Sequence, residues 1–121
     1  MRGGLILVES EISGPLGSLA LNLILDTGAT TSLIDGSLLK VVGYDPDASP
    51  DRAVITTGNG AVTAPRLMVN RLTAQGRHAI GLRVIAHDLP GEAKADGLLG
   101  LDFFRGLAPT IDFRAGRIAL A

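Results

Sequence analysis

The chain of 121 residues contains no cysteine and no tryptophan, and aromatic residues make up only 3% of it. The absence of cysteine excludes disulfide bonds, thiolate chemistry and cysteine-ligated zinc, although it leaves the cellular compartment open. Because hydrophobic residues nevertheless reach 46%, the core must be built mainly from Leu, Ile, Val and Ala. This length predicts a single domain over residues 1–121, with no room for a second one.

An excess of charge of one sign is also missing. Eleven Lys and Arg residues are mixed with twelve Asp and Glu residues, for a formal net charge of −1. Without a basic run or aromatic-basic interleaving, we expect no nucleic-acid partner. The longest apolar runs are far shorter than a membrane span, and residues 1–4 are not typical of a signal peptide. We expect a soluble domain with no membrane contact of its own; cytoplasm, periplasm and a tether through flanking sequence all stay open.

Sixteen glycines and six prolines are scattered along the chain, which favours short strands joined by tight turns. A short helix is predicted over residues 37–40, with Asp35 as N-cap and Gly43 as its C′ residue, and another over residues 103–106, capped by Asp102. The sequence therefore predicts an all-β domain with one or two short helices. Apolar and alternating runs predict strands over residues 5–12, 19–25, 31–34, 53–57, 61–64, 67–72, 80–86, 110–113 and 117–120.

The residue that most clearly suggests chemistry is Asp26, which directly follows an apolar strand and precedes Thr27 and Gly28. Hydrolysis of a peptide by water needs one carboxylate to accept a proton from the water and one carboxylic acid to protonate the carbonyl oxygen. Two aspartates at close range can do both, because they cannot both ionise readily and share one proton. Gly28 would let the backbone approach the second carboxylate, and Thr27 can form hydrogen bonds across a two-fold axis.

The Asp-Thr-Gly-Ala sequence at 26–29 resembles the signature of retropepsin-type aspartic proteases, and other features follow in that family's order. The Gly-Asn-Gly turn at 58–60 lies where the family has its flap, the β-hairpin that closes over substrate. The segment 97–100 resembles the apolar segment that threads behind the catalytic loop, and residues 102–104 resemble the start of the next helix. Residues 111–120 resemble the closing hairpin of the fold.

The resemblance extends over residues 7–120 and implies a small closed, barrel-like domain. It implies an endopeptidase that acts on extended polypeptides and needs neither cofactor nor metal. In this interpretation Asp26, Thr27 and Gly28 are the catalytic residues. The residues expected to bind substrate are Ala29, Thr30, Thr57, Gly58, Asn59 and Gly60.

Two features qualify the resemblance. Thr30 and Leu101 replace an Asp and an Arg that pair in retroviral members, and residues 98–104 are closer to bacterial and cellular relatives. The chain also has only one Asp-Thr-Gly triplet, so the second carboxylate must come from a second copy in a symmetric homodimer. The alternative is a non-catalytic protease-like domain that acts as a dimerisation or peptide-binding module.

Other polar residues are given structural roles. His78 and His87 are isolated, with no third ligand at metal spacing, so no metal site is predicted. Asp96 is interpreted as a turn residue. The residues interpreted as solvated strand edges are Arg66, Arg71, Arg77 and Arg83.

Overall fold

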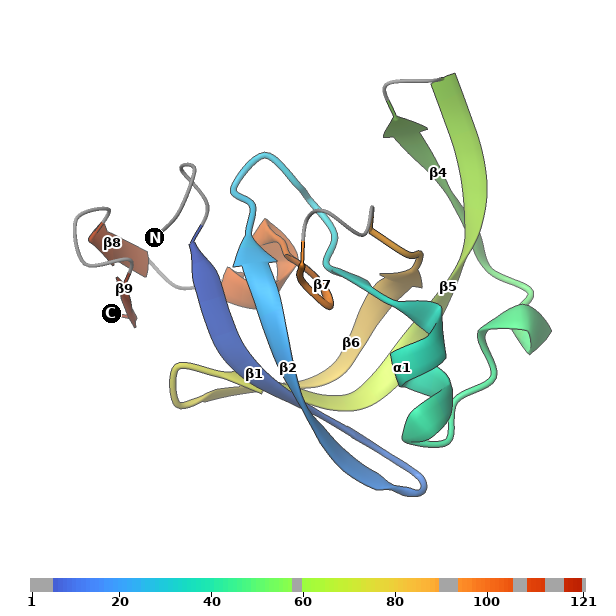
Figure 1. Cartoon of the computed structure of the whole chain (residues 1–121), viewed down its shortest axis with the longest axis horizontal. Coiled ribbons are helices and arrows are strands. Elements are labelled where there is room, and N and C mark those ends of the chain that lie inside the picture. Colours follow the sequence, from blue (N-terminus) through green and yellow to red (C-terminus); the bar gives the residue numbers. More distant parts are fainter. Residues whose placement is uncertain (1–5, 58–59, 90–93, 106–108, 113–116, 121) are drawn as a thin grey trace.

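The computed structural model describes residues 6–57, 60–89, 94–105, 109–112 and 117–120. Seven strands form one sheet in the order β1-β2-β7-β3-β6-β5-β4, and a further pairing between β1 and β5 closes it into a barrel from which β4 extends (Figure 1). The predicted all-β fold is thus confirmed. The strands are β1 (Leu7–Gly14), β2 (Gly17–Leu25), β3 (Leu33–Ile34), β4 (Arg52–Thr57), β5 (Gly60–Ala74), β6 (Arg77–Ala86) and β7 (Gly97–Leu99).

The barrel closes through two kinds of strand pairing. Neighbouring strands in sequence pair antiparallel, as β1 does with β2 and β5 with β6. In contrast, β7 runs parallel to β2 and antiparallel to β3, so it lies between two strands that precede it by more than sixty residues. This insertion brings the end of β2 beside the segment that follows β7.

Strand β5 is longer than the sequence predicts. Two strands were expected on either side of Pro65, but β5 continues through it. Arg52 pairs with Pro65 and the next residue, Arg66, pairs with Ile85. Pro65 therefore lies where β5 leaves β4 and begins to pair with β6, a position at which a missing N–H donor is tolerated.

Within the described ranges, three short helical segments accompany the barrel: α1 (Gly36–Val41) and the 3-10 helices η1 (Pro46–Ala48) and η3 (Leu101–Phe104). Helix α1 is one residue longer at each end than the predicted 37–40, but its predicted capping residues are confirmed, because Asp35 accepts a hydrogen bond from the Ser37 N–H and Gly43 adopts a φ of 101°. The predicted capping role of Asp102 is wrong, since the N-cap of η3 is Gly100.

The core is aliphatic, as the composition predicts. Strand β1 alternates between exposed and buried side chains, with Val8 and Ile12 inside. These pack with Leu23 of β2 and Leu99 of β7, and Phe103 of η3 is fully buried in the same cluster. Burial of this apolar surface is the main driving force for closing the barrel.

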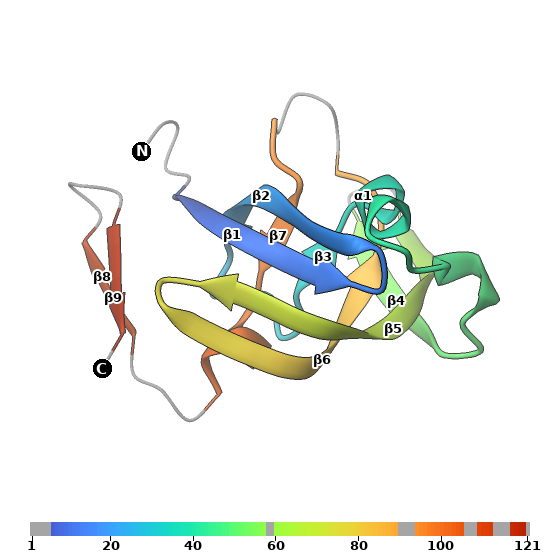
Figure 2. The ribbon, with the colours of Figure 1, turned by 90° about the horizontal axis from the view of Figure 1, so that it is seen from below.

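Strands β8 (Pro109–Asp112) and β9 (Arg117–Leu120) form the predicted closing hairpin. Among the described residues they pair only with each other and not with the barrel. Figures 1 and 2 show this hairpin standing to one side of the barrel.

Candidate active site

Asp26 is positioned by the strands on both sides of β2. The N–H of Leu25 donates to the carbonyl of Ile6, and the N–H of Asp26 donates to the carbonyl of Leu99 at 3.0 Å. Leu25 and Leu99 are also register partners in the parallel β2–β7 pair. The backbone of Asp26 is therefore held between β1 and β7 where the sheet ends.

The turn after β2 orients the carboxylate. The Gly28 N–H donates to Asp26 Oδ1 at 3.0 Å, and the Ala29 N–H donates to the Asp26 carbonyl at 3.1 Å. A Cβ at position 28 would lie only 3.3 Å from Oδ1, so a larger residue would crowd the carboxylate. Asp26 is half-buried, whereas Thr27 and Gly28 are exposed. Within the described part of the chain, Oδ2 of Asp26 accepts no hydrogen bond, which leaves it available to a water or a second carboxylate.

The segment after β7 crosses directly behind this turn. Leu101 N–H donates to the Ala29 carbonyl at 2.9 Å. A Cβ on Gly100 would lie 2.9 Å from the backbone of Thr31, and one on Gly97 would overlap the Leu33 carbonyl. Glycine is required at both positions because no side chain fits between the two backbones. The Gly-Leu-Leu-Gly sequence thus packs against residues 29–33, as the resemblance implied.

Ser32 and Asp102 hold the turn from behind, and the sequence did not reveal this pair. Ser32 is 0% exposed; its hydroxyl donates to Asp102 Oδ1 at 2.7 Å and accepts from the Gly100 N–H at 3.0 Å. The Ser32 N–H also reaches the same carboxylate at 3.0 Å. The only available signal was a small polar residue at the start of an apolar run. Asp102 therefore joins η3 to the loop that carries Asp26.

The predicted flap corresponds to a projecting hairpin, which we call the β4–β5 arm and define as residues 52–65. It extends beyond the barrel on the side toward which the loop after β2 also projects (Figure 1). Thr57 pairs with Gly60, which has a φ of 119°. Gly58 and Asn59 lie outside the described residues.

The inner face of the arm is apolar. Ile55 of β4 and Ala64 of β5 belong to a cluster with Leu33, Ile85 and Leu98. This cluster is separate from the barrel core and includes residues of β3, β6 and β7. The arm is thus connected to the strands next to the Asp26 loop through apolar contacts.

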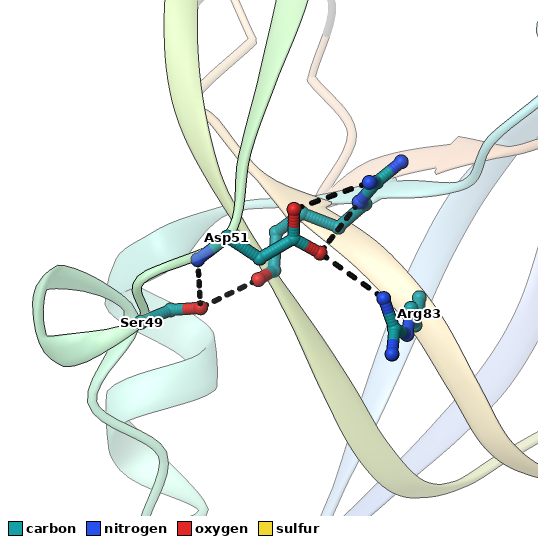
Figure 3. A network of polar contacts seen from close by, with 4 residues as sticks. Ser49, Asp51 and Arg83 are labelled. Carbon is teal, nitrogen blue, oxygen red and sulfur yellow. Dashed lines mark hydrogen bonds and ion pairs between the residues drawn. The ribbon is translucent and has the colours of Figure 1, made fainter.

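An ion-pair network lies at the base of the arm (Figure 3). Arg66 binds Asp51 through two hydrogen bonds, from Nε at 2.9 Å and Nη2 at 3.1 Å, and Arg83 reaches the same carboxylate at 3.3 Å. The hydrogen bond from Arg66 lowers the pKa of Asp51 below its ordinary value and raises the pKa of Arg66. Ser49 also links the segment before β4 to β5, since its hydroxyl donates to the Arg66 carbonyl at 2.6 Å and accepts from the Asp51 N–H at 3.3 Å.

The four strand arginines are therefore not simply solvated, and that prediction is wrong. Besides the two that bind Asp51, Arg77 donates to the Phe103 carbonyl at 3.0 Å and its guanidinium carbon lies 6.0 Å from the centre of the Phe103 ring. Arg71 lies within 3.4 Å of the Ser13 hydroxyl. Each contact bridges segments that are distant in sequence, which is why local patterns did not reveal it.

Of the predicted site residues, the structure brings residues 26–30 together in one loop, with Thr30 exposed at its far end. Thr57 and Gly60 lie in the separate β4–β5 arm. Among the described residues no group of three or more His, Asp or Glu side chains is arranged to hold a metal ion. The same part of the chain has no helix long and apolar enough to cross a membrane.

Comparison with known proteins agrees with this geometry. The sequence profile of a family described as aspartyl protease matches residues 8–103. A retropepsin-like aspartic protease from Rickettsia conorii has a similar structure, with a TM-score of 0.66 and 16% sequence identity over 93% of this chain and 80% of that one. Comparison with curated proteins gives no match. The turn at Asp26, the closed barrel and the matched profile show that this chain belongs to the aspartyl protease family and has a retropepsin-like fold.

Proposed function

We propose that two copies of this chain form an aspartic endopeptidase whose active site contains Asp26 from each copy. The observation that supports this most directly is the Asp26 carboxylate itself. It is half-exposed at the end of β2, is oriented by the Gly28 N–H, and has one oxygen without a hydrogen bond from the described residues. A chain with a single Asp-Thr-Gly triplet supplies one such carboxylate, so a pair requires a second copy.

The proposed chemistry uses one proton shared by the two carboxyl groups. The ionised Asp26 accepts a proton from a water molecule, which attacks the peptide carbonyl, while the protonated Asp26 donates its proton to the carbonyl oxygen. Proton transfer to the amine then releases the two products. The hydrogen bond from Gly28 holds each carboxylate in position, which reduces the entropy cost of reaching the transition state.

A mildly acidic optimum follows from the same arrangement. Position 29 is alanine, which offers no hydroxyl to the outer oxygens of the ionised pair. The pair is then less stabilised in its charged form than one flanked by Ser or Thr. We expect maximal activity at roughly pH 4–6.

Two features support dimer formation. Thr27 and Gly28 are exposed next to Asp26, where a two-fold axis would place them against the second copy. The β8–β9 hairpin pairs with no barrel strand among the described residues. Residues 117–120 are proposed as the terminal strand that adds area to the interface, with the N-terminal strand as the alternative.

The β4–β5 arm is proposed as the flap that closes over an extended peptide. Its inner face carries Ile55, which packs in one cluster with Leu33 and Leu98, and this partly buried apolar surface is proposed to contact substrate side chains. Thr57 and Gly60 lie at its tip, and residues 57–60 are proposed to contact the substrate backbone together with Ala29 and Thr30.

The test is cleavage of a complex peptide library, analysed by mass spectrometry between pH 4 and 7, with wild type, Asp26→Asn and Asp45→Asn. Asp26→Asn keeps the shape of the side chain and removes its titrating proton, so cleavage should fall by about 10³-fold or more. Asp45→Asn makes the same change at an exposed residue of another loop and should retain full activity. Cleavage by Asp26→Asn near the wild-type rate would contradict the proposal. If wild type bound peptides but cleaved none, the non-catalytic alternative would be correct.

A further inference from the structure

A hollow of about 450 Å³ lies beside the far end of the Asp26 loop. Thr30 and Thr31 of that loop form part of its lining, and three arginines contribute from other elements: Arg66 of β5, Arg83 of β6 and Arg105 after η3. We call it the arginine hollow. Three arginines therefore line the same hollow as Thr30, a residue predicted to bind substrate.

The cations in the hollow outnumber the carboxylates near them. Asp51 is shared by Arg66 and Arg83, so one carboxylate serves two guanidinium groups (Figure 3). Arg105 is exposed and forms no ion pair with any described residue. With Asp102 as the second carboxylate, three positive charges face two negative ones.

The two carboxylates also have more of their hydrogen-bonding capacity occupied than the guanidinium groups do. Asp102 accepts hydrogen bonds from the Ser32 N–H, the Ser32 hydroxyl and the Phe103 N–H. Asp51 accepts three from its two arginines. In contrast, Arg83 uses one nitrogen on Asp51 and its side chain remains 61% exposed. The groups that remain free to bind a ligand are therefore guanidinium N–H donors.

The hollow lies within reach of a peptide bound at Asp26. Thr30 follows Asp26 by four residues, so their Cα atoms are at most about 15 Å apart, given 3.8 Å between consecutive Cα atoms. An extended peptide advances about 3.3 Å per residue. A substrate side chain no more than about five residues from the scissile bond can therefore reach the hollow.

We propose that the arginine hollow is a substrate subsite that selects an acidic side chain, Asp or Glu, on either side of the scissile bond. This rests on the proposed function, in which two copies of the chain place one hollow on each side of the paired Asp26 residues. Arg83 and Arg105 donate charge-assisted hydrogen bonds to the substrate carboxylate, and the hydroxyls of Thr30 and Thr31 are available as further donors. A lysine at the same substrate position is repelled.

The experiment begins with peptides that wild type cleaves in the library. In each, residues up to five positions from the scissile bond are changed one at a time to Glu, Gln or Lys, and kcat/KM is measured at pH 6, where glutamate is ionised. We expect at least one position on each side at which Glu is preferred over Gln by about tenfold. The preference should shrink as salt is raised from 0.05 to about 0.5 M, because added ions screen the interaction.

Charge reversal gives the sharper comparison. Arg83→Glu and Arg105→Glu should each change the preference at that position from Glu toward Lys. Lys40→Glu makes the same charge change on α1, which lies outside the hollow, and should leave the Glu preference unchanged. Cleavage that depends on Asp26 but shows no acidic preference, or a preference that both reversals leave intact, would overturn this inference and not the proposed function. Loss of all Asp26-dependent cleavage in wild type would overturn both.

Discussion

Ser32 connects the loop that carries Asp26 with the segment behind it. Removing its hydroxyl therefore tests directly how much this connection stabilises the site. Ser32→Ala removes one oxygen that donates to Asp102 and accepts from the Gly100 N–H. The Gly100 donor is buried, and an unpaired buried donor costs about 1–3 kcal/mol. Asp102 loses one charge-assisted hydrogen bond but keeps those from the Ser32 and Phe103 backbones. We expect a total loss of about 2–4 kcal/mol in the free energy of unfolding.

The assay is urea unfolding at fixed protein concentration, because dimer formation makes apparent stability depend on concentration. A loss of this size lowers Tm by roughly 10 °C for a domain of this length. Ser37→Ala is the matched control, since its hydroxyl also donates to an aspartate, Asp35, but at an exposed helix end. It should cost less than about 1 kcal/mol, because the Asp35 carboxylate continues to cap α1 by accepting from the Ser37 N–H. If Ser32→Ala cost no more than Ser37→Ala, the inferred connection between the two segments would be wrong.

Three further predictions concern the packing of β7, the flap and the acid limit of stability. Gly97→Ala would overlap the backbone of β3 and should prevent folding to a soluble protein, whereas Gly36→Ala, whose Cβ has space at the start of α1, should be neutral or stabilising in the same expression and unfolding assays. Gly60→Val should reduce kcat/KM much more than it reduces the free energy of unfolding. Gly76→Val, at another positive-φ glycine with open space around it, should strain the backbone similarly but leave turnover unchanged. If the two variants had equal turnover, the arm would not act as a flap. The arginine hydrogen bond lowers the pKa of Asp51, so its stabilisation is present above the ordinary pKa of about 3.9 and is lost as pH falls through the lowered value. Unfolding at pH 3 and pH 6 should therefore show a smaller acid-induced loss for Asp51→Asn than for wild type, and an equal loss would contradict this assignment.

Much of the local structure could be predicted because its signals are local. The apolar run that ends at Asp26 is found as β2, and the turn after Gly14 is found between β1 and β2. Asp35 and Gly43 limit α1 as their side-chain chemistry and backbone freedom predict. In each case the residues that determine the structure are within a few positions of one another.

The parts that could not be predicted depend on residues far apart in the sequence. Ser32 and Asp102 are separated by 70 residues, and no local pattern links them. Asp102 was assigned to a helix cap because an aspartate before an apolar segment has the same sequence signal whether it binds its own helix or a distant loop. The parallel β2–β7 pairing has no local signal either, and the family resemblance indicated only that residues 97–100 pass behind the catalytic loop.

The ion pairs could not be predicted for the same reason, because their partners also come from different segments of the chain. Arg66 and Arg83 each stand between apolar residues in their strands, which is also the sequence pattern of a solvated strand edge. Their shared partner, Asp51, comes from the loop before β4. The ion pairs form because the antiparallel β4–β5 pairing, in which Arg52 lies opposite Pro65, places Asp51 beside Arg66, and the β5–β6 pairing places Arg83 opposite Met68 on the neighbouring strand.

The central claim is that activity requires Asp26 from two copies of the chain. It is tested most directly by adding Asp26→Asn to a fixed amount of wild type, well above the dimer dissociation constant and with time for subunit exchange. A mixed dimer has one aspartate and one asparagine in the pair, so random pairing through identical interfaces lowers activity to about half at equal amounts and to about one tenth at ninefold excess. Addition of Asp45→Asn, which keeps Asp26, should instead raise activity in proportion to the protein added. If activity stayed constant while sedimentation showed mixed dimers, or if a strict monomer were fully active, the shared active site would be wrong.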